Sequence, residues 1–170
     1  MHRNPWNRLL AWGVDWLCIL VWVAITAAVG VPLFLTGVTS GLTFWALNVI
    51  ASLILVVPVT LALAGLESSA REGSLGKRVR RLRVVDVATG DRVSFWRALA
   101  RNIMKIAAPW MIGHAAVFGI VASSDASAVP TAVWIVTAVA YILPVTYLVS
   151  LFVGSGRTPY DWAAGTAVVH

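Results

Sequence analysis

The sequence predicts an all-α membrane protein with four transmembrane helices arranged as two antiparallel hairpins. Of its 170 residues, 59% are hydrophobic and only 12% are charged, which is more apolar than a soluble domain of this length needs. Four apolar stretches are each long enough to cross a hydrocarbon core of about 30 Å, which takes about 20 helical residues. If these stretches cross the membrane, all 13 lysines and arginines lie on the same side of it, as the positive-inside rule predicts.

The predicted spans are residues 9–35, 42–66, 106–123 and 131–153. The connections at residues 36–41 and 123–130 are short and rich in turn formers, so each joins two spans into a hairpin. A signal peptide is the competing interpretation of the first stretch, but that apolar run is too long and contains Asp15. We predict one domain over residues 1–170, without the internal repeat that would indicate an inverted-repeat transporter.

The basic residues set the predicted orientation. Ten of the 13 lie between the second and third spans, and the connections within the two hairpins contain none. Both termini, the loop at residues 67–105 and the segment at residues 154–170 are therefore expected on the cytoplasmic side. The net charge of +6 then belongs to a membrane surface and not to a nucleic-acid site.

The central loop contains two signals of local structure. In "LRVVDVATGDRVS", residues 82–94, the turn former "ATGD" separates two short β-branched runs, which favours a small β-hairpin at the membrane surface. Ser94 then caps an amphipathic helix whose apolar residues recur at helical spacing against basic ones. We expect this helix to lie on the inner leaflet, with Pro109 marking the bend into the third span.

The C-terminal stretch "RTPYDWAAGTAVVH" is too short to cross the membrane. Thr158 is a suitable N-cap, Pro159 suits the first helical position, and Asp161 lies in the first turn. These residues predict a short helix near the inner surface that ends at Gly165.

A carboxylate, Asp15, lies inside the first apolar stretch, seven residues after Arg8. On a helix this spacing is about 10.5 Å along nearly the same face. A charge at this depth costs between about 2.5 and more than 10 kcal/mol unless it is paired, protonated or hydrated. Two interpretations stay open: Asp15 carries a proton or a small cation, or it anchors the first span to the arginine-rich segments through fixed hydrogen bonds and ion pairs.

His114 is a second titratable group at membrane depth, either a proton relay or an interhelical hydrogen-bonding group. The cationic residues of the loop form a predicted surface for anionic lipid or an acidic partner, although positive-inside topology also explains them. This surface comprises Lys77, Arg78, Arg80, Arg81, Arg83, Arg97 and Arg101.

Several chemistries are excluded. Gly76-Lys77 resembles the end of a phosphate-binding loop, but Arg71 stands where the first glycine belongs and Arg78 replaces the magnesium-binding hydroxyl. The lone cysteine, Cys18, allows neither an intramolecular disulfide nor a zinc site. Because no catalytic triad or carboxylate pair can be assembled either, we predict no enzymatic activity, metal or cofactor.

Three blocks of this sequence resemble the RDD family of bacterial membrane proteins, which is named for one arginine and two aspartates. They are Arg8 with Asp15, residues 73–102 and residues 157–169. The resemblance implies that Asp161 is the second aspartate and a partner for Arg8 at the cytoplasmic interface.

The resemblance also implies a multi-pass protein of the bacterial plasma membrane and a role in transport, including cation/proton exchange. The first hypothesis is a small transport component that uses Asp15, and it requires a homo-oligomer because four helices enclose little volume. Arg8, Asp15 and Asp161 would form a polar cluster at the inner face. Further cations would come from Lys77, Arg78 or Arg101. The alternative is a non-transporting scaffold that binds a protein partner or anionic lipid through residues 71–105.

Overall fold

The structure is a computed structural model that describes residues 4–124 and 127–170. Two positions of the predicted turn at residues 123–130 therefore lie outside the described residues. Within the described part, four helical stretches are long and apolar enough to cross a membrane, which confirms the predicted number of spans. Three of them are the single helices α1 (Pro5–Leu35), α2 (Phe44–Glu67) and α6 (Thr131–Phe152).

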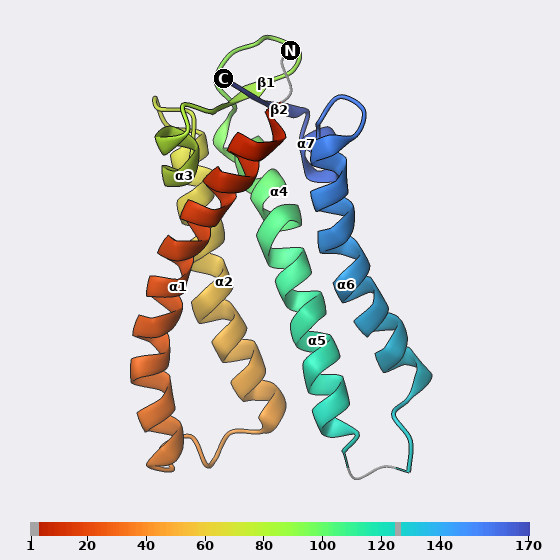
Figure 1. Ribbon diagram of the computed structural model, residues 1–170. Coiled ribbons are helices and arrows are strands. Elements are labelled where there is room, and N and C mark those ends of the chain that lie inside the picture. Colours follow the sequence, from red (N-terminus) through yellow and green to blue (C-terminus); the bar gives the residue numbers. More distant parts are fainter. Residues whose placement is uncertain (1–3, 125–126) are drawn as a thin grey trace.

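The third span is composite. It consists of α4 (Phe95–Asn102), the π-helical turn η1 (Ile103–Ala107) and α5 (Ala108–Ala122), which follow one another without a break (Figure 1). The amphipathic segment predicted to lie along the membrane is thus the first part of the third span. It extends the helical stretch to 28 residues, Phe95–Ala122.

The π-helical turn explains why the chain does not break at Pro109. Proline lacks the N–H group that would bond to the carbonyl of an earlier turn, so a helix must leave a carbonyl without its usual donor. Here the hydroxyl of Tyr147 on α6 donates to the carbonyl of Met104 at 2.9 Å. The wider turn and this hydrogen bond from α6 replace the predicted bend.

The two hairpins, α1 with α2 and α5 with α6, meet at one end of the bundle. Figure 1 shows α1 and α6 converging toward the end that carries both chain termini and diverging toward the other end. The first of these ends holds α3 (Leu75–Val79), α4, α7 (Pro159–Ala163), β1 (Arg83–Asp86) and β2 (Thr166–Val169). We call it the basic end, and it consists of the start of α1, residues 68–102 and residues 154–170.

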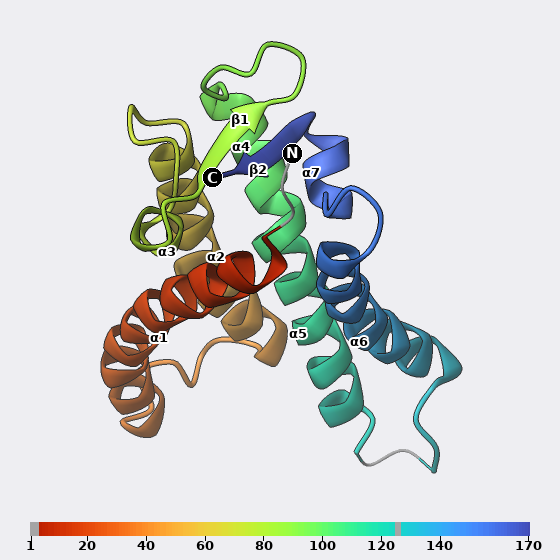
Figure 2. The same ribbon diagram turned by 45° about the horizontal axis from the view of Figure 1, so that its top comes forward.

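A two-stranded sheet covers the basic end. β1 pairs antiparallel with β2, so that Val85 lies opposite Ala167, and the two strands lie side by side in Figure 2. The predicted hairpin within the loop survives only as an isolated bridge between Val85 and Arg92. The main partner of β1 is instead the C-terminal strand β2. Val84 and Val85 of β1 are buried, and Val84 forms a small core with Ala64, Val93 and Ala98.

The C-terminal helix begins where the sequence places it. The Asp161 carboxylate accepts a hydrogen bond from the Thr158 N–H at 3.2 Å, and Pro159 is in the first turn. Gly165 follows the helix with a φ of +65°, a left-handed conformation that favours glycine. This conformation turns the chain into β2, a strand that the sequence reasoning did not predict.

Candidate functional site

Asp15 is buried, with 5% of its surface exposed. The hydroxyl of Ser74 donates to its Oδ2 at 2.6 Å and the N–H of Gly76 donates to its Oδ1 at 2.8 Å. The two donors lie at the start of α3, which rests on α1 so closely that a Cβ on Gly76 would lie 1.9 Å from the carbonyl oxygen of Ala11. Asp15 therefore fastens the start of α3 to α1.

Glu67, the last residue of α2, is the central carboxylate of the site and was missed in the sequence reasoning. It is fully buried and accepts hydrogen bonds from Lys77 Nζ at 2.6 Å, from Arg101 Nη1 at 2.7 and 2.8 Å, and from Asn102 Nδ2 at 2.9 Å. The available signal was a single carboxylate that ends an apolar span immediately before a strongly basic loop. Such a group needs cationic partners in order to be buried.

Asp161 is the second fully buried carboxylate. Arg8 Nη2 lies 2.6 Å from its Oδ2, and Arg101 Nε lies 2.8 Å from its Oδ1. Burial opposes the ionised form, but the guanidinium groups of Arg101 and Arg8 outweigh it and hold the pKa of Asp161 below its usual range. The structure therefore brings Arg8 and Asp161 together, as the resemblance implies, with Arg101 as a shared partner.

These contacts form one continuous network in which cations and carboxylates alternate. Its members, in order, are Arg8, Asp161, Arg101, Glu67, Lys77, Ser74 and Asp15. We call this set the charge network. Its three cations and three carboxylates balance, and Arg8 and Asp15 occupy opposite ends of it without touching. The network joins both hairpins, because Glu67 belongs to α2 and Arg101 to the third span.

Two members of the predicted basic surface are buried, so that part of the prediction is wrong. Lys77 and Arg101 are 6% and 1% exposed, because each turns toward Glu67. Arg78 and Arg80 are half-buried and donate hydrogen bonds to Leu66 and Asn7, respectively. The exposed members are Arg81, Arg83 and Arg97.

Burial also changes the acidity of Lys77. Removing its ammonium group from water lowers the pKa more than the Glu67 carboxylate raises it, and the nearby cations Lys105 and Arg101 lower it further. The resulting pKa of Lys77 is about 8, against an ordinary value of 10.5.

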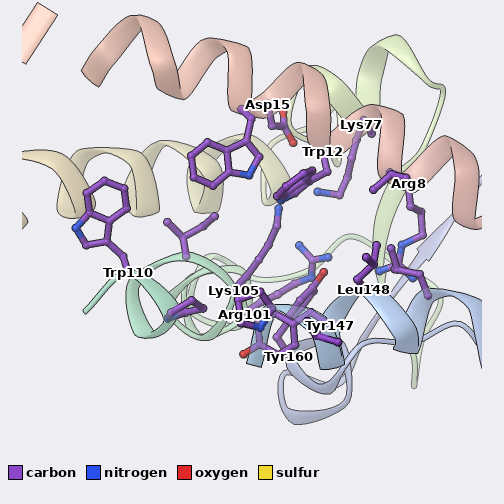
Figure 3. Close-up of a pocket in the computed structure, with 18 of the residues that line it drawn as sticks. Arg8, Trp12, Asp15, Lys77, Arg101, Lys105, Trp110, Tyr147, Leu148 and Tyr160 are labelled. Carbon is purple, nitrogen blue, oxygen red and sulfur yellow. The ribbon is translucent and has the colours of Figure 1, made fainter. Parts of the chain in front are cut away.

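A pocket of about 580 Å³ lies beside the charge network, between the first helix and the α5–α6 hairpin. Figure 3 shows Asp15 and Trp12 on the α1 side and Lys105, Tyr147 and Tyr160 on the opposite side. The charged groups gather at one end of the pocket. Its remaining wall is apolar and aromatic, and includes Trp16, Trp110 and Leu148.

Lys105 is half-buried and lines this pocket. Its ammonium group makes no hydrogen bond or ion pair with any residue that the structure describes. Lys105 is therefore a basic residue beside the charge network that has no bonded carboxylate of its own.

His114 lines the pocket farther from the basic end and is not part of the charge network. Its Nδ1 lies 3.0 Å from Oδ1 of Asn48 on α2, and its ring stacks on Trp110 at 4.9 Å. The contact with Asn48 matches the interpretation of His114 as an interhelical hydrogen-bonding group.

Comparison with known proteins places the chain in a family. Searches of curated proteins and of solved structures found no significant match to it. The model of the RDD family, in contrast, matches residues 3–165, nearly the whole chain. This multi-pass membrane protein therefore belongs to the RDD family.

Proposed function

We propose that this protein is a non-transporting membrane component that associates with anionic lipid through its basic end, with that end on the cytoplasmic side. Two functions followed from the sequence, and the geometry favours the second. The observation that carries this choice is the pairing of Asp15, whose two oxygens already accept hydrogen bonds from Ser74 and Gly76.

A carrier carboxylate must exchange its partners for a proton or a cation in every cycle. Releasing Asp15 from its partners would leave two buried donors unpaired, at a cost of about 1–3 kcal/mol each. It would also detach the start of α3 from α1. The geometry thus supports the anchor interpretation of Asp15, and it gives the same anchoring role to the buried pairs of Glu67 and Asp161.

The outer surface of the basic end supports the lipid assignment. The guanidinium groups of Arg71, Arg81 and Arg92 are exposed and form no hydrogen bond or ion pair within the described part of the chain. Exposed tryptophans border the same end of the bundle: Trp6 at 66%, Trp96 at 74% and Trp162 at 61%. Free arginines beside exposed tryptophans suit the headgroup region, where each basic residue contributes about 1 kcal/mol of attraction to anionic lipid.

Lipid-dependent melting tests the lipid assignment. The purified protein is melted in neutral detergent with added phosphatidylglycerol or phosphatidylcholine, beside a variant that combines Arg71→Gln, Arg81→Gln and Arg92→Gln. We expect the anionic lipid to raise the melting temperature more than the zwitterionic lipid, and the variant to lose most of that difference. Because exposed charges are screened, 0.5 M salt should have the same effect as the variant. Equal effects of the two lipids on the parent protein would contradict the proposal.

A flux assay tests the absence of transport. Proteoliposomes with a preset pH gradient receive sodium, potassium or lithium, and the parent is compared with Asp15→Asn and with protein-free vesicles. We expect the gradient to decay at the same rate in all three. A cation-driven collapse in the parent that disappears in a folded Asp15→Asn variant would overturn the proposal and make Asp15 a carrier.

A further inference from the structure

Lys105 differs from the charged residues of the charge network because it has no bonded partner of opposite charge among the described residues. The charge network contains three cations and three carboxylates, each bonded to a neighbour of opposite sign or, for Asp15, to Ser74 and Gly76. Lys105 is a seventh charged group beside it, and its ammonium bonds to no described residue. The charged end of the pocket therefore holds one basic group without a bonded counter-ion, and the charged form of such a group is costly away from bulk water. A ligand with one negative charge would stabilise the ammonium form of Lys105.

The rest of the pocket is apolar. It continues from Lys105 past Trp110 to His114, nine residues or about 13 Å along the helix. That length is close to half of a hydrocarbon core of about 30 Å, so the pocket spans roughly one leaflet. Its volume of about 580 Å³ lies within the usual range of about 300–1,000 Å³ for small-molecule sites.

We infer that this pocket binds one amphipathic anion, whose phosphate or carboxylate headgroup pairs with Lys105 and whose hydrocarbon chain lies against Trp16 and Trp110. The charge and the apolar lining of the pocket both favour this class of ligand. A small cation would meet the positive charge of Lys105, and inorganic phosphate would leave the apolar wall uncovered. The site is separate from the exposed arginines of the outer surface, so it does not depend on the function proposed above.

Native mass spectrometry of the full chain in neutral detergent tests this inference, with dodecyl phosphate as the probe. We expect one bound molecule per chain, and at least a tenfold loss of affinity in Lys105→Met. Lys105→Arg should keep most of the binding because it keeps the charge. Arg81→Gln is the matched control, since it removes an exposed cation outside the pocket and should leave binding unchanged.

A second variant keeps the test valid if Lys105→Met does not fold. Leu148→Trp adds bulk to an apolar lining residue of the pocket that is 45% exposed, without altering any charge, and it should also weaken dodecyl phosphate binding. Neither inorganic phosphate nor the uncharged dodecyl maltoside should occupy the site. Competition by phosphatidylglycerol identifies a membrane lipid as the source of the headgroup, whereas competition by free fatty acid alone identifies a single-chain amphiphile.

Two results would overturn the inference. One is dodecyl phosphate binding of equal affinity in the parent and in both folded variants, Lys105→Met and Leu148→Trp. The other is saturable binding of inorganic phosphate at Lys105 without a hydrocarbon chain. A variant that lacks Arg71, Arg81 and Arg92 should lose the lipid-dependent rise in melting temperature and still bind dodecyl phosphate. This result would support a pocket that is separate from the outer surface.

Discussion

At the scale of single residues, the burial of Asp15 and the glycine at position 76 depend on each other. A buried carboxylate in an apolar helix needs donors close by, and the N–H of Gly76 reaches it only because α3 approaches the backbone of α1. Any side chain at position 76 would occupy the space of the Ala11 carbonyl. The glycine before Lys77, which superficially resembles part of a phosphate loop, thus has a packing role.

Gly76→Ala tests this packing. Its Cβ would lie 1.9 Å from the carbonyl oxygen of Ala11, so α3 must move away and lose the hydrogen bond to Asp15. We expect a loss of about 1–3 kcal/mol in the free energy of unfolding, typical of overpacking, measured by denaturation in detergent. Gly65→Ala is the control, because nothing lies within 4 Å of a Cβ there. Similar losses in both variants would refute the close contact between α3 and α1.

The lowered pKa of Lys77 should make the stability of the fold depend on pH. Its pKa is about 8 in the folded protein and 10.5 ordinarily, so between these pH values the unfolded chain binds the proton that the folded chain has released. Raising the pH through this window therefore favours folding. The parent should gain stability over Lys77→Met between pH 8 and 10, by at most about 1.4 kcal/mol per pH unit. Melting curves at pH 7, 8, 9 and 10 measure this gain, and a constant difference between the two proteins would contradict the shift.

At the scale of elements, the apolar spans were predictable because length and hydropathy determine them. The composite third span was not, because the amphipathic pattern of residues 95–105 is equally typical of a helix on the membrane surface. What distinguishes the two is burial of Arg101 and Asn102 against Glu67, a contact between segments about 35 residues apart. The π-helical turn likewise depends on a hydrogen bond from Tyr147, on another helix.

The small sheet shows the same limit. The turn and the β-branched residues of β1 were visible in the sequence, whereas its pairing partner was not. β2 is four residues long and directly follows a helix that was itself predicted. Only the folding back of the C-terminus over the basic end places Ala167 opposite Val85.

At the scale of the whole molecule, the charge network joins two hairpins that diverge away from the basic end (Figure 1). Arg8, Asp15 and Asp161 could be proposed as a group from the family resemblance. For Glu67 the sequence offered only the signal that it needs cationic partners. Nothing in a single sequence shows that its partner is an arginine of the third span. The predicted surface failed at Lys77 and Arg101 for the same reason, since their common partner was unknown.

The ion pair of Glu67 and Arg101 ties the two hairpins together. A double-mutant cycle with Glu67→Gln and Arg101→Met, followed by denaturation in detergent, tests it most directly. Each single variant strands a buried charge and should lose about 3–5 kcal/mol. The double variant should lose less than the sum of the two by at least about 1 kcal/mol, because residues in one ion-pair network are coupled. Losses that add within about 0.5 kcal/mol would show that the two residues act independently and would contradict the claim.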